Sequence, residues 1–306
     1  MDDYDMYVKV PASTANLGPG FDSVGMALQL YTTLKVKQSN RTKFYLVGDN
    51  QENIPTDKSN LIYQTIDFLY KKAGLQTPEL EIEVETDIPL ARGLGSSGTA
   101  IVGGLVAANV LAGEPFSKQE IFQFASEMEG HPDNVGASLF GGIIVAAKNE
   151  LGDYAHVPLS PPKGLKIVVA IPDFELPTKL AREVLPDDYS RQDVVHALSH
   201  SALLVAAIAK GDLSALQVAL EDRIHQPYRM ALLPGFEALQ KNCRNYGAFG
   251  TVISGAGPTI LAFTTGDCTQ LVDFMEKTLQ NHGVSAKVME LAIDTSGTTC
   301  SVLLKK

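Results

Sequence analysis

Hydrophobic and polar positions follow several distinct patterns along this chain, and four segments are typical of strands. Residues 79–85 alternate strictly between polar and apolar, which predicts a strand with one face in water. Residues 165–171 are an almost continuous apolar run, which predicts a buried strand. Residues 250–253 and 260–263 predict two short strands around a glycine-rich connection.

Other segments carry apolar residues at helical spacing. Residues 59–73 predict a helix that ends at Gly74. Ser117 and Glu120 have the spacing of a capping box, so a further helix should begin there. Residues 192–210 predict a long apolar helix that stops before a glycine. Helices and strands therefore occur in both halves of the chain, which indicates an α+β fold.

One segment breaks the composition of the chain. Residues 158–164 contain three prolines and a glycine in seven positions, which is typical of a linker or domain edge. We therefore expect two domains, at residues 1–160 and 161–306.

Composition and charge narrow the class of protein. The chain has 306 residues and a formal net charge of −10, which disfavours nucleic acid as a partner. Its three cysteines are far apart and form no CxxC pair, so reduced thiols are expected. The acidic start lacks the features of a signal peptide, and the apolar run at residues 99–113 is too short for a membrane span. These features predict a cytoplasmic protein without a membrane partner.

The glycine-rich loop at residues 89–99 is the segment most typical of a ligand site. Glycines allow a close approach of the backbone, and the following helix offers free N–H groups to a phosphate. A Walker A loop is excluded because no lysine is present. Gly93, Gly95 and Gly98 match the dinucleotide pattern GxGxxG, but the residues from Pro89 to Arg92 separate them from the strand. A packing loop without a ligand is the other interpretation.

Two further loops contain polar or glycine-rich clusters. Residues 11–22 include Asn16 and Asp22, which either bind a polar substrate or make Asx turns. Residues 254–259 include Gly255 and Gly257, which form either a ligand loop or a simple hairpin turn.

Three motifs in one order carry a resemblance to a known family. They are P-A-S-T-A-N-L-G-P-G-F-D at residue 11, P-L-A-R-G-L-G-S-S-G at residue 89 and S-G-A-G-P-T at residue 254. This arrangement resembles the GHMP kinase superfamily. Within it the chain is most similar to the homoserine kinases, through residues 129–134, 226–229 and 233–236. Gly98 departs from the pattern, which usually has alanine there.

The resemblance implies a two-domain GHMP kinase fold and an ATP site. The N-terminal domain would be similar to domain 2 of ribosomal protein S5, and the C-terminal domain would be ferredoxin-like. The residues implied to bind ATP are Pro89, Leu90, Ala91, Arg92, Gly93, Leu94, Gly95, Ser96, Ser97, Gly98, Thr99, Gly255 and Gly257. Mg²⁺ would be held by Ser97 and Glu129, with Glu127 as a rival carboxylate.

The implied reaction is ATP-dependent phosphorylation of the side-chain hydroxyl of L-homoserine, in threonine biosynthesis, by a homodimer. The implied substrate residues are Asn16, Asp22, His131, Asp133, Asn134, Arg182 and Arg229, with Arg223 as a substitute for Arg229. Arginine would bind the carboxylate, and Asp22 the ammonium or the hydroxyl. Ser97, Asp133 and Asn134 are the expected catalytic residues, and Asp133 is either a base or a positioning group.

Three other functions remain open at this point. The chain could be a mevalonate- or sugar-type kinase of the same superfamily, an NAD(P)-binding oxidoreductase, or a binding protein without catalysis. His196 and His200 have the i, i+4 spacing of a zinc-binding pair, but no third ligand is visible in the sequence. They are therefore predicted to be structural.

Overall fold

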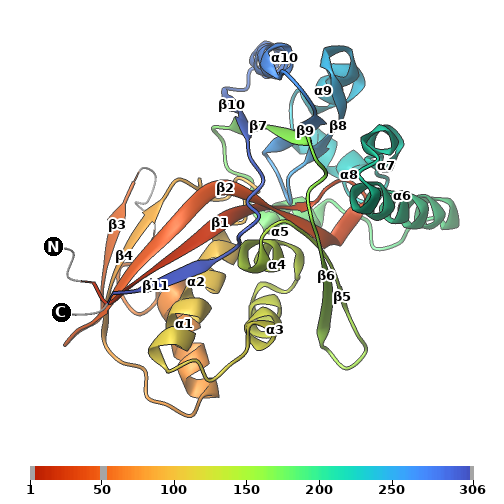
Figure 1. Ribbon diagram of the computed structural model, residues 1–306. Coiled ribbons are helices and arrows are strands. Elements are labelled where there is room, and N and C mark those ends of the chain that lie inside the picture. Colours follow the sequence, from red (N-terminus) through yellow and green to blue (C-terminus); the bar gives the residue numbers. More distant parts are fainter. Residues whose placement is uncertain (1–3, 49–53, 304–306) are drawn as a thin grey trace.

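The chain folds around two antiparallel-rich sheets, and the computed structural model describes residues 4–48 and 54–303 (Figure 1). The first sheet has seven strands, with β11 (Thr299–Val302), β1 (Met6–Asn16), β2 (Gly20–Gln38), β4 (Leu80–Thr86) and β3 (Lys43–Val47) in spatial order. β5 (Ile143–Lys148) pairs with β2 and with β6 (Tyr154–Leu159). The second sheet has the order β10 (Ala286–Leu291), β7 (Lys166–Pro172), β9 (Ile260–Thr264) and β8 (Ala248–Ile253).

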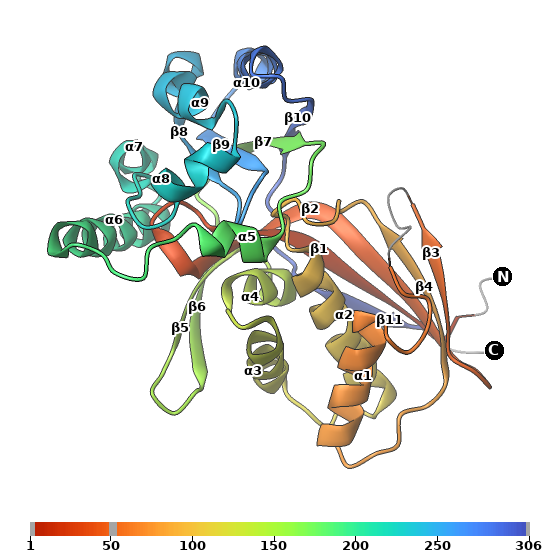
Figure 2. The same cartoon turned by 180° about the vertical axis from the view of Figure 1, so that it is seen from behind.

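Four helices cover one face of the first sheet, as both views of the ribbon show (Figures 1 and 2). They are α1 (Leu61–Lys72), α2 (Ser96–Leu111), α3 (Lys118–Glu129) and α4 (Asp133–Phe140). Their apolar sides and the sheet enclose the largest core cluster, which includes Leu34, Ile66, Ile82 and Phe122. Burial of this apolar surface is the main stabilising term for the first half of the chain.

The remaining helices accompany the second sheet. They are α5 (Thr178–Glu183), α6 (Arg191–Lys210), α7 (Leu216–Ala219), α8 (Gln226–Arg229), α9 (Phe236–Asn242) and α10 (Thr269–Asn281). Helices α9 and α10 pack on one side of this sheet through Phe236, Leu239 and Met275. Residues from β1 and β2 join α6, α7 and the second sheet in a separate core cluster, so the two sheets share buried apolar residues.

The elements predicted from the sequence are present. The expected strands correspond to β4, β7, β8 and β9, and the helix expected at residues 59–73 corresponds to α1. Ser117 caps α3 in a complete capping box with Glu120. The helix expected at residues 192–210 is α6, which ends at Gly211 in the left-handed conformation.

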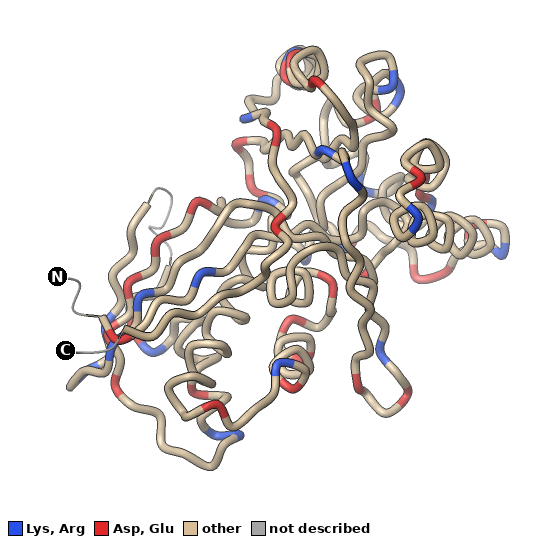
Figure 3. The backbone as a smooth tube through the Cα atoms, viewed as in Figure 1, with Lys and Arg blue, Asp and Glu red and all other residues tan. Residues whose placement is uncertain are grey.

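The polar face of β4 is less open to water than strict alternation suggests. Glu81 and Glu83 face Lys37 and Lys35 across the β2–β4 pairing, at 3.0 and 2.7 Å. Figure 3 shows the same mixture of charges along the strands of this sheet. Each cross-strand ion pair of this kind adds about 0.2–1 kcal/mol to the stability of the sheet.

The predicted domain boundary falls between β6 and β7, where the chain passes from the first sheet to the second. The last strand then returns: β11 pairs with β1, from Met6 opposite Val302 to Lys9 opposite Thr299. Residues 299–302 thus belong to the sheet of the first half. Nothing in the local sequence of residues 299–302 indicated this partner.

The dinucleotide-binding interpretation of the glycine loop is wrong. A Rossmann unit requires a parallel sheet with the first glycine directly after its strand. Here β4 ends at Thr86, α2 begins at Ser96, and β4 pairs antiparallel with β2 and parallel only with the edge strand β3.

Gly98 offers a direct test of helix propensity in α2. A Cβ atom at Gly98 would lie 3.5 Å from Asn134 and Val135, which is ordinary van der Waals contact. We therefore expect Gly98→Ala to raise the free energy of unfolding by about 0.5–1 kcal/mol, because glycine loses more backbone entropy than alanine in a helix. Urea unfolding measures this change.

Gly93→Ala is the matched control in the same loop. Gly93 has φ +76°, and its Cβ would overlap the carbonyl oxygen of Ser254. This variant should lose stability. A Gly98→Ala variant no more stable than the parent would show that the first turn of α2 does not have ordinary helical energetics.

Candidate active site

A cavity of about 370 Å³ opens where loops from both halves of the chain meet. It is lined by charged and polar residues that lie far apart in the sequence. They include Asn16, Asp22, Ser96, Ser97, Glu129, His131, Asp133, Asn134, Arg182, Arg229 and Gly255. The structure thus brings together every residue that the sequence analysis assigned to substrate or metal.

Hydrogen bonds between the three motif loops build the floor of this cavity. The hydroxyl of Ser254 lies 2.9 Å from Thr14 Oγ1 and donates to the Gly93 carbonyl at 2.5 Å. The backbone N–H of Gly255 donates to Ala15, and that of Thr259 donates to Arg92, at 3.1 and 3.2 Å. The loops therefore form one hydrogen-bonded junction.

The glycine loop delivers the N-terminus of α2 to the cavity. Gly95 is the N-cap residue, in the left-handed conformation, and no side chain caps the helix. The first N–H groups of a helix have no partner within the helix and carry the positive end of its dipole. Ser96 and Ser97 sit in this first turn and line the cavity, so the loop has the geometry of an anion site.

Part of the glycine loop also serves to pack closely against neighbouring segments, as the alternative interpretation of its sequence predicted. A side chain at Gly95 would overlap the Ser13 hydroxyl, just as one at Gly93 would overlap Ser254. Leu94, Gly98 and Thr99 are buried. The same loop therefore packs tightly against its neighbours and presents a helix N-terminus to the cavity.

Some residues of the expected ATP set lie away from the main cavity. Gly257 donates its N–H to Ser254 at 2.8 Å and closes the turn of the third loop. Thr99 uses its hydroxyl on the Ser96 carbonyl at 2.9 Å. The guanidinium of Arg92 donates to the Pro172 carbonyl, so it links the loop to β7. Pro89 lies in the turn that follows β4.

A second, apolar cavity of about 290 Å³ adjoins the N-terminus of α2. Its walls come from β2, β4, α1 and the glycine loop, with Ile54, Ile62, Val84, Ile88, Leu90 and Thr99 among them. Ser96 and Ser97 line both cavities. A polar and an apolar space therefore meet at the first turn of α2.

Ser97 and Glu129 form the candidate metal site. Ser97 Oγ donates to Glu129 Oε2 at 2.9 Å, and both residues line the cavity. Burial raises the pKa of Glu129, and His131 and the Ser97 hydrogen bond oppose this shift. The rival Glu127 is exposed and does not line the cavity. A hydroxyl and a carboxylate are both oxygen ligands suited to Mg²⁺.

His131 and Asp133 form a short ion pair beside this site. His131 Nδ1 lies 2.8 Å from Asp133 Oδ1, which also accepts the N–H of Asn134 at 2.7 Å. Burial lowers the pKa of His131, but the hydrogen bond and charge of Asp133, together with Glu129, outweigh it and raise the pKa overall. Asp133 Oδ2 is buried and accepts no hydrogen bond from the described residues.

Asp22 and Arg182 neutralise each other in a bidentate pair. The two guanidinium nitrogens donate to the two carboxylate oxygens at 2.7 and 3.0 Å. This hydrogen bonding raises the pKa of Arg182. The sequence analysis assigned the two residues to opposite ends of a substrate, whereas the structure joins them directly.

Arg229 is held by the protein rather than projecting freely. It is almost fully buried, and its Nε and Nη1 donate to the carbonyls of Ala181 and Gly255, both at 2.9 Å. Burial and the nearby Arg182 lower the pKa of Arg229 to about 10, so the side chain is still charged near neutral pH. The rival Arg223 lies 3.7 Å from Asp193 and does not line this cavity.

Asn16 lines the cavity and also has a structural role. Its Nδ2 donates to the Gly255 carbonyl at 3.0 Å, and its Oδ1 accepts the N–H of Asp22 at 3.0 Å. Asn16 and Asp22 both have positive φ, at +74° and +51°. These bonds are not Asx turns, because they reach six residues along the chain and across to the third loop, but they do fix the position of Asp22.

The sequence analysis missed His225, which orients Arg229. His225 is fully buried, with Nε2 2.9 Å from the Gly18 carbonyl and Nδ1 3.1 Å from Arg229 Nη1. Burial, opposed by Asp222, lowers the pKa of His225. Phe21 stacks on His225 and lies 5.5 Å from both Arg182 and Arg229. A lone histidine carries no local pattern, so only the fold reveals this group.

Family models match both halves of the chain. The model for the GHMP kinases N terminal domain matches residues 60–142, and the model for the GHMP kinases C terminal domain matches residues 204–281. Together with the site, these matches define the class of protein as a GHMP kinase.

Individual relatives narrow this class. A homoserine kinase of Deinococcus radiodurans is 45% identical over 293 residues, or 95% of each chain. Among solved structures, a homoserine kinase from Cytophaga hutchinsonii has a TM-score of 0.87 at 27% identity, covering 98% of this chain and 99% of the other. A putative homoserine kinase from Listeria monocytogenes has a TM-score of 0.77 at 34% identity, covering 97% and 99%. The chain therefore belongs to the homoserine kinase family of the GHMP kinases.

Proposed function

We propose that this protein is an ATP-dependent homoserine kinase that converts the side-chain hydroxyl of L-homoserine to a phosphate ester, in threonine biosynthesis. The observation that carries this proposal is a single cavity lined both by the N-terminus of a helix and by fixed arginine and aspartate side chains. A phosphate donor and an amino-acid acceptor need these two chemistries side by side.

The nucleotide is expected to bind across the N-terminus of α2. The backbone N–H groups of Ser96 and Ser97 suit the phosphates, and the adjoining apolar cavity suits the flat, largely apolar adenine base. In this arrangement Leu90 and Thr99 contact the base side rather than the phosphates. Gly93, Gly95 and Gly257 act by holding the loops close together.

Ser97 and Glu129 are the residues that would hold Mg²⁺. Their oxygens already lie 2.9 Å apart and both residues line the cavity, and Mg²⁺ keeps several waters besides its protein ligands. The bound ion would supply charge neutralisation for the transferred phosphoryl group. Glu127 does not line the cavity, so it is not assigned this role.

L-Homoserine is expected to bind between Asp133 and the two arginines. Arg229 has Nη2 left over after its hydrogen bonds through Nε and Nη1, and this nitrogen suits the substrate carboxylate. The carboxylate of Asp22, paired with Arg182, is placed to accept from the ammonium group. Asp133 Oδ2 is the buried acceptor left for the reacting hydroxyl.

Positioning is the main catalytic contribution of these residues. Asp133 is itself oriented by His131 and by the N–H of Asn134, and Asn134 Oδ1 accepts a hydrogen bond from Ser13 at 3.0 Å. A hydroxyl held in line with the phosphoryl group needs little further help, because phosphoryl transfer depends chiefly on orientation and charge stabilisation.

Two other functions remain as outcomes of the test. A kinase for another small alcohol would bind the nucleotide in the same way and would accept an alcohol other than homoserine. A binding protein without catalysis would bind both ligands and show no turnover.

The first prediction concerns turnover. We expect ADP release from MgATP to depend on homoserine. Ser97→Ala and Glu129→Gln should each lower kcat/KM by at least about 100-fold, because the first removes a hydroxyl oxygen and the second removes the negative charge of the carboxylate near the transferred phosphoryl group. A coupled ADP assay with homoserine, threonine, serine, galactose and mevalonate measures this.

Glu127→Gln is the matched control, since it removes an exposed carboxylate from the same helix without touching the cavity. It should retain the parental rate. Turnover with mevalonate or galactose but not with homoserine would show that the phosphoryl acceptor is a different alcohol. No turnover with any alcohol would overturn the kinase proposal.

The second prediction separates positioning from base catalysis at Asp133. We expect Asp133→Asn to keep a measurable rate, reduced by about 10²–10³-fold, because the amide still accepts a hydrogen bond from the substrate hydroxyl. The pKa of His131 should fall in this variant, because the carboxylate that raises it is gone. Steady-state kinetics and an NMR titration of His131 provide the two readouts. Complete loss of turnover with normal homoserine binding would indicate a base.

We further propose a homodimeric, cytoplasmic enzyme without a nucleic-acid or membrane partner. The cysteines Cys243, Cys268 and Cys300 are free. Among the described helices, α6 alone is long and apolar enough by composition to cross a membrane. Its Leu204, Ala207 and Ile208 are buried in the core, as in an amphipathic helix at a protein surface.

The third prediction concerns assembly through the outer side of α6. Val195 and Leu198 are 57% and 68% exposed there, and Val218 on α7 is 51% exposed. Apolar residues of this kind favour a subunit contact. We expect light scattering to give about twice the 32.8-kDa mass of the chain, and Leu198→Asp to give the monomer. A monomeric parent protein would contradict the dimer.

A further inference from the structure

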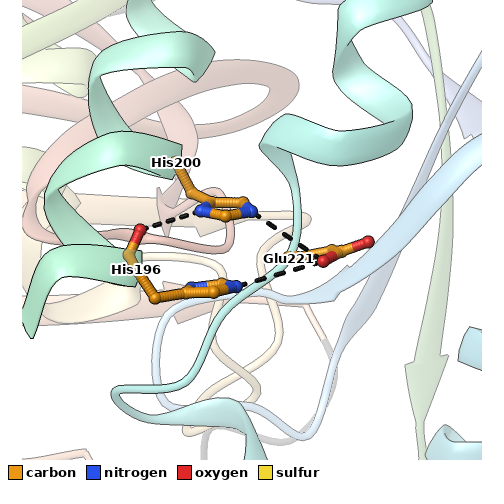
Figure 4. A group of neighbouring side chains, drawn as sticks. All are labelled: His196, His200 and Glu221. Carbon is orange, nitrogen blue, oxygen red and sulfur yellow. Dashed lines mark hydrogen bonds and ion pairs between the residues drawn. The ribbon is translucent and has the colours of Figure 1, made fainter. Parts of the chain in front are cut away.

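A second group of ligand-type side chains lies on the far side of the second half of the chain, away from the cavity described above. His196 and His200 come from α6, and Glu221 follows α7 (Figure 4). The two rings are stacked, with centroids 3.6 Å apart and an interplanar angle of 10°. Both Nε2 atoms therefore point in the same direction, toward the carboxylate.

The sequence analysis set the histidine pair aside because no third ligand was visible. The fold supplies that ligand. Glu221 Oε2 lies 4.0 Å from His196 Nε2 and 3.8 Å from His200 Nε2. The three ligand atoms lie within 4.8 Å of one another.

These distances are too long for hydrogen bonds, which have N···O separations of about 2.7–3.2 Å. They are closer to the spacing of ligands around an ion. Tetrahedral ligands about 2.0–2.1 Å from a zinc ion are about 3.3–3.4 Å apart. To close the remaining difference, the half-exposed Glu221 side chain would turn toward the rings. The two stacked rings would also tilt apart, so that both Nε2 lone pairs converge on one ion.

The hydrogen bonding of His200 fixes its tautomer. His200 Nδ1 lies 2.8 Å from the carbonyl oxygen of His196, which only accepts, so Nδ1 carries the hydrogen. Ser199 also lies near, with its hydroxyl 3.2 Å from His200 Nδ1 and donating to the same carbonyl at 2.9 Å. In the neutral ring the lone pair is then on Nε2, facing the Glu221 carboxylate.

Two electron-pair donors that face each other across a gap favour a cation between them, which is either a proton on the ring or a metal ion. A backbone carbonyl that holds the far nitrogen of a histidine is also the usual outer contact of a metal-bound imidazole. The arrangement of His200 thus has both the free donor atom and the supporting contact of a metal ligand.

The surroundings leave space for solvent ligands. His196 and Glu221 line a cavity of about 440 Å³ whose walls also carry Arg223, Lys241 and Arg244. Arg223 pairs with Asp193, and Lys241 pairs with Glu237 at 2.6 Å. Arg244 donates to the carbonyls of Gln217 and Phe249. The neighbouring cations are therefore directed to partners of their own.

We propose that His196, His200 and Glu221 form a binding site for a divalent transition metal ion such as Zn²⁺, completed by water. Two imidazoles and one carboxylate favour Zn²⁺, Co²⁺, Ni²⁺ or Cu²⁺ over Mg²⁺ or Ca²⁺, which prefer oxygen ligands. The site is separate from the Ser97–Glu129 pair.

The position of the site indicates a structural role for the ion. An ion there would tie α6 to the segment that precedes α8. Asp222, the next residue after Glu221, accepts the N–H groups of Ile224, His225 and Gln226 at 2.8, 3.0 and 2.7 Å. These contacts set the start of α8, which carries Arg229.

The test is titration of the untagged, chelator-treated protein with Co²⁺ and Zn²⁺. We expect one ion per chain, visible d–d absorption bands with Co²⁺, and a rise in Tm with Zn²⁺. His200→Gln and Glu221→Gln should each weaken Zn²⁺ binding at least tenfold and abolish the rise in Tm. The double variant His196→Gln/His200→Gln should bind no ion at this site.

His282→Gln is the matched control. His282 is an exposed histidine whose Nδ1 has the same contact to the carbonyl four residues earlier, Thr278 at 2.8 Å, but it belongs to no such cluster among the described residues. This variant should bind Zn²⁺ like the parent. Absence of binding by the parent at 100-µM-scale Zn²⁺, or equal binding by the double variant, would overturn the proposal. Circular dichroism shows whether each variant is folded.

Discussion

The junction around the Ser254 hydroxyl is the constraint on which the active-site cavity depends. At this point the N-terminal loop, the glycine loop and the connection between β8 and β9 exchange hydrogen bonds. The space between them is so small that Gly93 and Gly95 cannot carry side chains. The position of the α2 N-terminus relative to the second sheet follows from this packing, and so does the distance between the two ends of the cavity.

Charge pairing inside the cavity has a consequence for how a substrate is recognised. Asp22 is paired with Arg182, and Asp133 with His131, so the protein offsets most of its own buried charge. Loss of His131 would leave the buried carboxylate of Asp133 without its partner and would cost about 3–5 kcal/mol, whereas the half-exposed Asp22 and Arg182 are partly screened by solvent. Oδ2 of Asp133 is buried and has no hydrogen-bond partner among the described residues.

Much of the fold could be predicted from local sequence, because local physics governs it. The capping box at Ser117, the glycine stops at Gly74 and Gly211 and the alternation along β4 all act within a few residues. The return of β11 to β1 could not be predicted in this way. Strand pairing depends on the burial of side chains across the whole sheet. The sequence of a four-residue strand such as β11 therefore does not indicate its partner.

The same division holds for the sites. The order of three motifs was enough to indicate the family, the phosphate loop and the residues of the cavity. Only the tertiary structure decided that Asp22 faces Arg182, that His225 holds Arg229, and that Glu129 rather than Glu127 meets Ser97. It also brought Glu221 to the two histidines of α6. Spacing along a helix fixes which residues share a face, but the partner opposite that face comes from elsewhere in the chain and is set by long-range packing.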